Sequence, residues 1–324
     1  MAAPAVETRG LSKSFEKVEA VRSLDLTVNE GEMFCLVGPD GAGKTTTIRL
    51  LCGLVRPDAG RASILGFDLE RDPGRIKERI GYLSQKFSLY GDLTVDENIE
   101  FFAEIHRVRD FRERREELLE FTRLTPFRDR LAERLSGGMR QKLALACTLI
   151  HTPRLIFLDE PTTGVDPVSR RDFWAILSSL LRSGITIVMA TPYMDEAERS
   201  SRVGLLSGGR LLAADAPQAL KRLMRGTVVE VVCRDIRRAF AVLKGLAGVR
   251  EVQLFGDRLN AVVDEPESVV PRLEAALARE GIAVVHKRLL PPSLENVFIS
   301  VTSADTEGLS PRGSVPLEIP GGPS

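Results

Sequence analysis

The sequence predicts an α/β fold with a mostly parallel sheet, followed by a smaller α+β domain. Three compact apolar runs, MFCLVG from Met33, LIFLDE from Leu155 and ITIVMAT from Ile185, have the composition of buried strands. Helical segments separate them, and this alternation is typical of a parallel sheet. After Gly226 the order changes to βαββαβ. The expected elements there are strands at 228–233, 249–255, 259–263 and 282–287 and helices at 236–246 and 269–279.

The length of 324 residues suits two domains. We expect a first domain over residues 1–225, a second over 226–302, and a disordered tail rich in Pro, Gly and Ser over 303–324. Alternating residues from 6 to 28 predict short antiparallel strands. Residues 101–135 are helical and heavily charged, with both signs at i, i+4 spacing, which favours a solvated helix face over a nucleic-acid arm.

Composition excludes several classes of partner and environment. Lys plus Arg and Asp plus Glu number 45 each, and this balance gives no bulk attraction to nucleic acid, so we expect no nucleic-acid partner. The N-terminus lacks the apolar core of a signal peptide, and no apolar run is long enough to span a membrane. The cysteines lack the spacing of zinc or redox motifs, and we expect reduced core residues of a cytosolic protein. They are Cys35, Cys52, Cys147 and Cys233.

The segment GPDGAGKT, Gly38 to Thr45, matches the phosphate-binding pattern G-x-x-x-x-G-K-[ST]. Glycines let backbone N–H groups approach phosphate oxygens, and the following helix aims its positive N-terminus at the same anion. Lys44 supplies a charge for the outer phosphates, and the Thr45 hydroxyl can bind Mg²⁺. A structural glycine turn is the alternative, which the flanking strand and helix disfavour. The expected nucleotide-binding residues are Gly38, Pro39, Asp40, Gly41, Ala42, Gly43, Lys44, Thr45 and Thr46.

Two carboxylates end the strand LIFLDE. Asp159 is placed to hold the Mg²⁺ shell, and Glu160 can orient or deprotonate an attacking water. The alternative is that this acidic pair only caps the strand.

A second anion-binding terminus is predicted at LSGGMRQKLAL, Leu135 to Leu145. Ser136 is the expected N-cap, and Gly137 and Gly138 open the helix. One nucleotide cannot sit on two separated phosphate sites of one chain. We therefore expect a head-to-tail, two-fold pair in which Ser136 and Gly138 of one copy contact the ATP held by the other.

Together these motifs resemble the ATPase subunits of ATP-binding-cassette (ABC) transporters, over about residues 6–225 and in the family's order. GPDGAGKTT looks like the Walker A loop, with Asp40 where Asn is common. LSGGM looks like the signature motif, with Met139 in place of the usual Gln. LIFLDEP is similar to Walker B, and GVDP is similar to the D-loop, with Val165 for the common Leu.

The resemblance implies further site residues. Gln85 in GYLSQKFSLY looks like the Q-loop glutamine, which in the family senses Mg²⁺ and couples the site to the membrane partner. Asp166 of the D-loop joins the expected nucleotide contacts. Phe15 falls where the family stacks an aromatic ring on adenine, and plain core packing is the alternative.

One position departs from the family. There, the strand after Walker B ends in a histidine that reaches the terminal phosphate, and alignment on T-x-x-x-x-E-A places Pro192 at this point. A proline has no side-chain donor. Either Glu160 carries the hydrolysis alone, or Thr191 or Tyr193 compensates, or turnover is slow; a harmless subgroup variation is the other interpretation. We expect slow but real hydrolysis. The histidines lie elsewhere: His106, His151 and His286.

The resemblance implies an ATP-hydrolysing subunit that uses ATP and Mg²⁺. Such a subunit pairs as a homodimer or heterodimer and docks on a separate transmembrane permease at the cytoplasmic face of the cell membrane. The ending Pro292–Phe298, P-S-L-E-x-V-F, resembles that of drug-export subunits and favours export of a hydrophobic drug, lipid or antibiotic. We expect the second domain to support the dimer or to regulate it, with small-ligand sensing as the alternative.

Other functions remain open. A non-transport ABC protein acting on ribosomes or DNA usually carries two cassettes or a long coiled coil, and this chain has neither. A binding module that holds ATP with little hydrolysis would fit Pro192. A plain P-loop kinase would not need LSGGM.

Overall fold

The computed structural model describes residues 4–85 and 89–306. These form two compact units that divide between Pro217 and Gln218, within helix α8 (Pro217–Lys221). The sequence placed this boundary at Gly226. A Cβ atom at Gly226 would lie 2.6 Å from the carbonyl oxygen of Val263, in strand β13 (Arg258–Val263). Gly226 is therefore packed inside the second unit and does not belong to a free linker.

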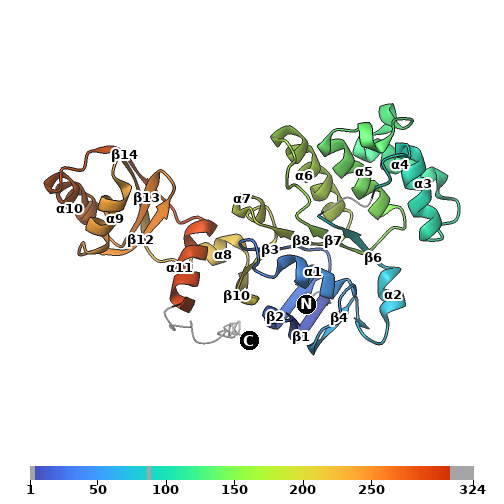
Figure 1. Cartoon of the computed structure of the whole chain (residues 1–324), viewed down its shortest axis with the longest axis horizontal. Coiled ribbons are helices and arrows are strands. Elements are labelled where there is room, and N and C mark those ends of the chain that lie inside the picture. Colours follow the sequence, from blue (N-terminus) through green and yellow to red (C-terminus); the bar gives the residue numbers. More distant parts are fainter. Residues whose placement is uncertain (1–3, 86–88, 307–324) are drawn as a thin grey trace, which may run out of the picture. The chain divides into compact units, whose positions relative to one another are not determined.

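The first unit contains a six-stranded sheet whose strands are parallel except at one edge (Figure 1). The three predicted strands are its central members and are buried along their whole length, although the third begins at Thr186. Because parallel strands end at the same edge, the segments after β3, β7 and β8 meet there. The spatial order is β10 (Arg210–Asp215), β9 (Arg202–Ser207), β3 (Met33–Val37), β8 (Thr186–Thr191), β7 (Leu155–Asp159) and β6 (Ile80–Leu83).

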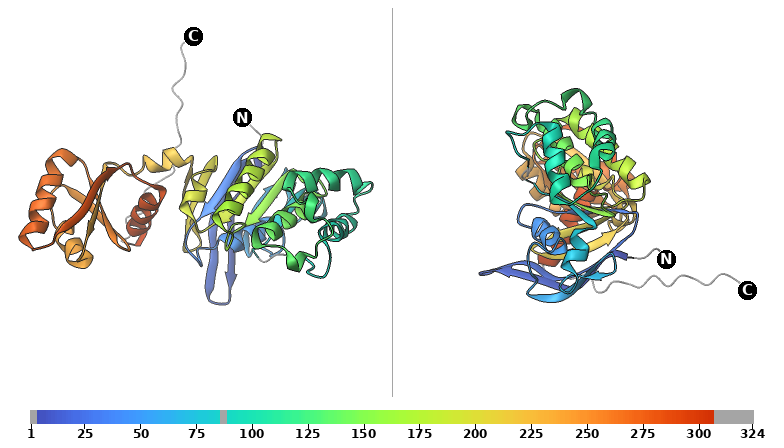
Figure 2. Two further views of the ribbon diagram at one scale, coloured as in Figure 1. Left: turned by 90° about the horizontal axis from the view of Figure 1, so that it is seen from above. Right: turned by 90° about the vertical axis from the view of Figure 1, so that its right-hand side faces the viewer.

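An antiparallel sheet accompanies it, and its long hairpin of β1 and β2 extends beyond the helices in Figure 2. The prediction of short strands was wrong, because both hairpin strands have 12 residues. Their pairing shifts register at several points, so the alternation of apolar residues is interrupted although the strand continues. The order is β2 (Val18–Asn29), β1 (Pro4–Phe15), β4 (Ala59–Ile64) and β5 (Phe67–Asp68).

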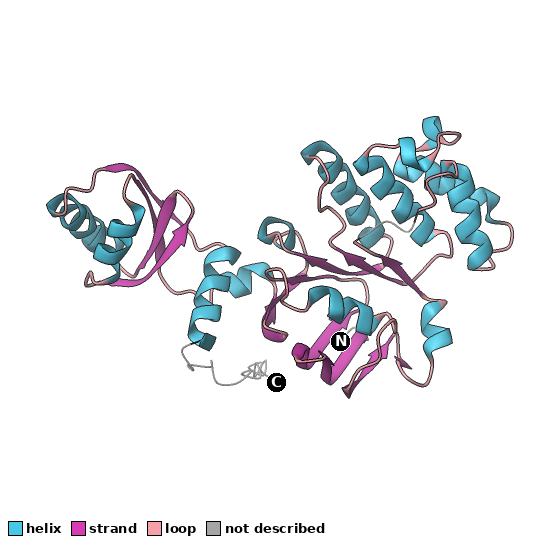
Figure 3. Cartoon of the chain, viewed as in Figure 1, coloured by secondary structure: helices cyan, strands magenta, loops and turns pink. Residues whose placement is uncertain are grey.

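Helix α1 (Lys44–Leu51) lies between the two sheets, and its buried face packs into the main core with Phe34, Phe157 and Val188 (Figure 1). Helices α5 (Gly137–Leu149) and α6 (Pro167–Arg182) lie on the other side of the parallel sheet (Figure 3). The remaining helices of this unit are α2 (Pro73–Lys77), α3 (Val95–Ile105), α4 (Phe111–Thr122), α7 (Met194–Ala197) and the 3₁₀ turns Thr125–Phe127 and Ala132–Arg134.

The charged region predicted at 101–135 is helical, but it begins earlier and is interrupted. A capping box of Thr94 and Glu97 starts α3 at Val95. Helix α4 ends where Arg123 adopts a left-handed conformation with a φ of 58°. Exposed i, i+3 pairs such as Arg114–Glu117, at 2.8 Å, confirm the solvated face. All four cysteines are buried and free, as predicted.

The second unit has the predicted βαββαβ order and a wholly antiparallel sheet. This strand order is that of a ferredoxin-like domain. The last strand runs three residues further than predicted, to Leu290. Helices α9 and α10 cover one face of the sheet, and α11 lies at the other (Figure 3). The elements are β11 (Thr227–Cys233), α9 (Ile236–Lys244), β12 (Val249–Phe255), β13, α10 (Pro266–Arg279), β14 (Val284–Leu290) and α11 (Leu294–Thr306).

The motif Pro292–Phe298 starts α11 and fixes it to the sheet. Asn296 Oδ1 accepts hydrogen bonds from the backbone and hydroxyl of Ser293, and its amide donates to Gln253 Oε1 at 2.8 Å. Helix α11 continues to Thr306, so the prediction that the disordered tail begins at Ser303 was wrong for its first four residues. The rest of that tail lies outside the described residues.

Two histidines stack where α3 and α5 end. The rings of His106 and His151 lie 4.0 Å apart at 8° to each other, and His151 Nε2 is 2.9 Å from the carbonyl oxygen of Ile80. Burial lowers the pKa of His151 to about 4, and the charge of His106 acts in the same direction. The folded pKa therefore lies below the ordinary value of 6.5, so the unfolded chain takes up this proton first as the pH falls.

We predict that this histidine makes the protein less stable in acid. As the pH falls from about 7 to about 5, His151 is protonated in the unfolded chain but not in the folded one, and this lowers the unfolding free energy by about 2 kcal/mol. The variant His151→Gln should lose less stability over this range than wild type in urea unfolding. The control is His286→Gln, since His286 lies on the exposed strand β14. Equal pH slopes for His151→Gln and wild type would contradict the prediction.

Candidate nucleotide-binding site

The phosphate loop joins β3 to α1 and is shaped by close backbone contacts. A Cβ at Gly38 would lie 2.1 Å from the carbonyl oxygen of Leu206, and one at Gly43 would lie 2.2 Å from that of Ala20. Gly43 also has a φ of +100°, a backbone conformation that residues with a side chain adopt only with strain. These two glycines therefore let the loop pass between neighbouring strands.

Lys44 lies inside the loop. Its side chain is 4% exposed, and Nζ donates to the carbonyl oxygens of Gly38 at 2.8 Å and Pro39 at 3.0 Å. The Glu160 carboxylate lies 3.8 Å from the same ammonium. Beside it is a cavity of roughly 260 Å³ at the N-terminus of α1. Its lining comprises Val18, Ala20, Asp40, Gly41, Gly43, Lys44, Thr45, Thr46 and Glu160.

Asp159 and Thr45 provide oxygen atoms next to this cavity. Thr45 Oγ1 donates to Asp159 Oδ1 at 2.9 Å, whereas the buried Oδ2 has no hydrogen-bond partner among the residues that the structure describes. Burial raises the pKa of Asp159, the Thr45 hydrogen bond opposes this shift, and the charge of Glu160 adds to it. A cation would satisfy the free oxygen and stabilise the charged carboxylate. The pair therefore fits Mg²⁺, which takes one or two protein oxygens together with phosphate oxygens.

Glu160 reaches the cavity because its backbone leaves the strand. Consecutive side chains of a strand point to opposite faces, so Asp159 and Glu160 would normally diverge. Glu160 instead has a φ of +50°, and its N–H donates to the carbonyl oxygen of Ala190 at 2.8 Å. Its Oε2 accepts from Gln85 Nε2 at 2.9 Å and Thr163 Oγ1 at 3.3 Å. Both carboxylates thus lie at the phosphate loop.

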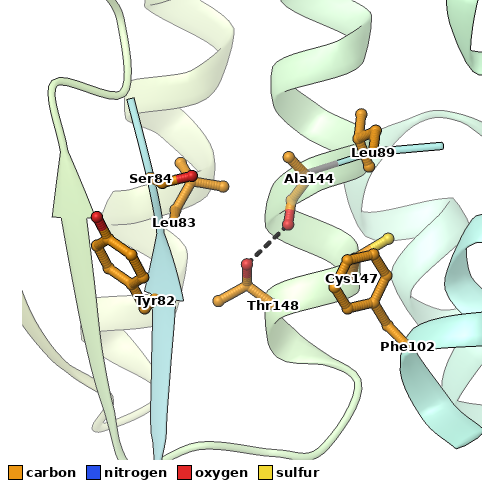
Figure 4. A pocket seen from close by; sticks show the side chains of 8 residues that line it. All are labelled: Tyr82, Leu83, Ser84, Leu89, Phe102, Ala144, Cys147 and Thr148. Carbon is orange, nitrogen blue, oxygen red and sulfur yellow. Dashed lines mark hydrogen bonds between the residues drawn. The ribbon is translucent and has the colours of Figure 1, made fainter. Parts of the chain in front are cut away.

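Strand β6, which ends two residues before Gln85, packs against helix α5. Figure 4 shows a small cavity between the strand end, where Tyr82 to Ser84 precede Gln85, and the side chains of Cys147 and Thr148 on α5. Its volume of about 40 Å³ leaves room for water but not for a nucleotide. The predicted Q-loop glutamine therefore lies two residues beyond a strand that packs directly on the helix of the LSGGM motif.

The LSGGM motif starts α5 as predicted. Ser136 is the N-cap and accepts from the Met139 N–H at 3.3 Å. A Cβ at Gly138 would lie 2.3 Å from Ser169 Oγ of α6, whereas the nearest atom of the described residues to a Cβ at Gly137 would be the carbonyl oxygen of Gly164, at 4.0 Å. Ser136, Gly137 and Gly138 do not line the cavity beside Lys44. Within one chain, the two helix termini predicted to bind anions thus face different spaces.

Asp166 has a local structural role. Its carboxylate caps α6 by accepting from the N–H groups of Val168 at 3.0 Å and Ser169 at 2.9 Å. Hydrogen bonds from Ser169 lower the pKa of Asp166. The structure does not bring Asp166 to the cavity beside Lys44. Its predicted contact with nucleotide stays a prediction.

Phe15 ends β1 and is 46% exposed, so the alternative interpretation, that Phe15 only packs in the core, was wrong. Lys13 Nζ lies 5.5 Å from the centre of its ring. The ring does not line the cavity, although Val18 and Ala20 of the adjoining strand do. Stacking on adenine therefore stays a prediction.

Pro192 follows the last residue of β8, and its two neighbours are already engaged. The Thr191 hydroxyl is buried, donates to Glu196 Oε2 at 2.8 Å and accepts from the Tyr193 N–H at 3.2 Å. The Tyr193 ring lies 5.0 Å from the guanidinium of Arg170. Thr191 is thus oriented toward Glu196. Glu196 was not predicted as a site residue; the signal for it in the sequence is an acidic residue beside Ala197, shortly after a buried strand.

The loop, its lysine and the two converging carboxylates define a nucleoside-triphosphate-binding protein of the P-loop class. A model of the ABC transporter family matches residues 21–163. A second model, for the C-terminal domain of DrrA1-3-like ATP-binding proteins, matches residues 216–302.

Known proteins resemble the whole chain. The daunorubicin resistance ATP-binding protein DrrA2 of Streptomyces coeruleorubidus is 37% identical over 94% of this chain and 96% of its own length. The probable multidrug ABC transporter ATP-binding protein YbhF of Escherichia coli is 38% identical over 98% of this chain, which spans 55% of YbhF. The chain belongs to the family of ABC transporter ATP-binding proteins.

Solved structures support the fold of the first unit. The ABC transporter cassette MJ0796, determined as a dimer, superposes with a TM-score of 0.60 and 26% identity over 65% of this chain and 98% of that chain. Among residues 4–85 and 89–306, none of the helices has the length and apolar character needed to cross a membrane.

We predict that the contact between α5 and α6 tolerates no side chain at Gly138. The variant Gly138→Ala should lower the unfolding free energy by about 1–3 kcal/mol, because Ser169 has to move. Adding Ser169→Gly should restore most of the loss in a thermal unfolding assay. The matched control Gly137→Ala, which has open space, should be neutral or stabilising. Equal effects of the two alanine variants would contradict this packing.

Proposed function

We propose that the chain binds and hydrolyses ATP to power export through a separate membrane permease. The observation that carries this proposal is that Lys44, Thr45 and Glu160 line one cavity at the N-terminus of α1, where Thr45 is hydrogen-bonded to Asp159. Phosphoryl transfer needs mainly positioning and charge stabilisation, which these groups can supply. Two relatives whose names refer to drug resistance or multidrug transport support export.

The residues divide the chemistry among them. Loop N–H groups and Lys44 bind the phosphates, and Thr45 with Asp159 would hold Mg²⁺, which neutralises charge on the phosphate oxygens. Glu160 orients the attacking water and takes its proton, while Gln85 positions the Glu160 carboxylate through their 2.9 Å hydrogen bond. The phosphate–oxygen bond to the leaving ADP then breaks as water attacks the terminal phosphorus.

Two copies of a cassette share each nucleotide in this proposal. The α5 N-terminus with Ser136, Gly137 and Gly138 does not face the cavity of its own chain, so a second copy is needed to bring it to the phosphates. The dimeric cassette MJ0796 shows that this fold forms pairs. The partner cassette is an identical or a different chain, and the pair docks on the permease at the cytoplasmic face of the membrane.

The cargo class follows from the relatives alone. We propose a hydrophobic drug-like or lipid-like molecule, because DrrA2 is named for daunorubicin resistance and matches both units of this chain. The second unit contributes a ferredoxin-like domain, to which we assign dimer support or regulation.

An ATP-binding module with almost no hydrolysis is the second candidate function of the same site. Pro192 provides no donor to the terminal phosphate, and Thr191 is oriented toward Glu196. A module that holds ATP and splits almost none would have the same geometry. Activity relative to a variant without the water-orienting carboxylate separates the two.

We predict that the purified protein hydrolyses MgATP faster than Glu160→Gln by about 10²-fold or more, since a positioned general base contributes on this scale. The measurement is phosphate release at saturating ATP, and the assembled permease complex is tested in parallel. Lys44→Ala serves as the control that fails to bind nucleotide tightly. Wild-type activity equal to that of Glu160→Gln would make the chain a binding module.

A further inference from the structure

The buried carboxylate of Glu196 joins three segments around the nucleotide site. The residue is 1% exposed, Oε1 accepts a hydrogen bond from Thr162 Oγ1, and Oε2 accepts one from Thr191 Oγ1 at 2.8 Å. Arg170 Nε lies 3.5 Å from Oε1. A carboxylate is buried at high cost unless it is paired and hydrogen-bonded, and Glu196 has both kinds of partner.

Two partners of Glu196, Thr162 and Arg170, lie next to the proposed catalytic residues or in the helix that follows them. Thr162 stands two residues after Glu160, and its carbonyl oxygen accepts from the Val165 N–H at 3.1 Å, one residue before Asp166. Arg170 lies in the first turns of α6, which Asp166 caps. Glu196 therefore holds both ends of the segment between the Walker B carboxylates and the start of α6.

The Glu160 backbone needs such a support. A φ of +50° at a residue other than glycine persists only where its surroundings fix it. On the strand side, the Glu160 N–H is held by the carbonyl oxygen of Ala190. On the loop side, Thr163 N–H and Thr163 Oγ1 both contact Glu160, and the neighbouring Thr162 is anchored to Glu196.

We propose that Glu196 is a positioning residue for ATP hydrolysis. It fixes the segment Glu160–Asp166 to the end of β8 and so keeps the Glu160 carboxylate beside Lys44 and Gln85. The inference rests on the hydrolysis proposed above. In this proposal Thr191, which precedes a proline without a donor, holds the end of β8 in place through the hydrogen bond from its hydroxyl to Glu196.

The test compares steady-state hydrolysis of four variants of the full chain. Glu196→Gln keeps the shape but replaces one accepting oxygen by an amide NH2 group, which can only donate, so kcat should fall about tenfold while KM for ATP changes less than about twofold. Thr162→Val should act similarly, and Thr162→Ser should retain activity. The double variant Glu196→Gln/Thr162→Val should be no slower than either single one, because both remove the same interaction.

A second readout does not depend on activity. In Glu196→Gln, the backbone amides of residues 162–166 and 168 should exchange hydrogen faster, while those of α1 keep their protection. The control is Glu230→Gln in the second unit, which removes another buried carboxylate, paired with Arg288 at 2.6 Å, and should leave kcat unchanged.

Two results would overturn the proposal: an unchanged kcat together with unchanged exchange in Glu196→Gln, or effects of Glu196→Gln and Thr162→Val that add. A KM that rises in proportion to any loss of kcat/KM would also overturn it, since Glu196 would then support nucleotide binding. If wild type is no faster than Glu160→Gln, the proposed hydrolysis fails, and the exchange measurement alone decides whether Glu196 holds the segment.

Discussion

The nucleotide site depends on the backbone turn at Glu160. Strand β7 delivers Asp159 to Thr45, but the regular alternation of a strand would send the next carboxylate to the opposite face. The left-handed conformation at Glu160 turns its side chain back toward Lys44, at 3.8 Å. Local strain of this kind has to be offset by neighbouring contacts. The hydrogen bonds from Gln85 and Thr163 and to Ala190 supply them, and Glu196 supports the loop behind.

The proposed sharing of each nucleotide by two copies rests on where the two helix N-termini lie. Lys44 and the two carboxylates converge on the N-terminus of α1, whereas α5 presents its own N-terminus, capped by Ser136, elsewhere. The tight contact of Gly138 with Ser169 fixes α5 against α6, so α5 cannot simply turn toward the loop of its own chain. A second copy is the direct way to bring a capped, positive helix end to the phosphates.

Much of this arrangement was predictable from sequence, because it rests on short-range rules. The loop pattern fixed the cradle around Lys44, the strand pattern placed Asp159 at a sheet edge, and Ser136 was recognisable as an N-cap. Interactions between distant segments were not predictable. The φ of Glu160 and the contact of Gly38 with Leu206 depend on which strands become neighbours, and a single sequence does not show this. The same applies to Glu196, whose partner Thr162 lies 34 residues away.

The most direct test of the shared site mixes two variants, each defective in a different half. Lys44→Ala and Ser136→Arg should both be inactive alone. If the site is built from Lys44 of one copy and Ser136 of the other, a mixed dimer keeps one intact site, and an equal mixture should recover about a quarter of wild-type phosphate release. A mixture that forms mixed dimers, verified by capture through different tags, yet stays as inactive as the separate variants would contradict the account.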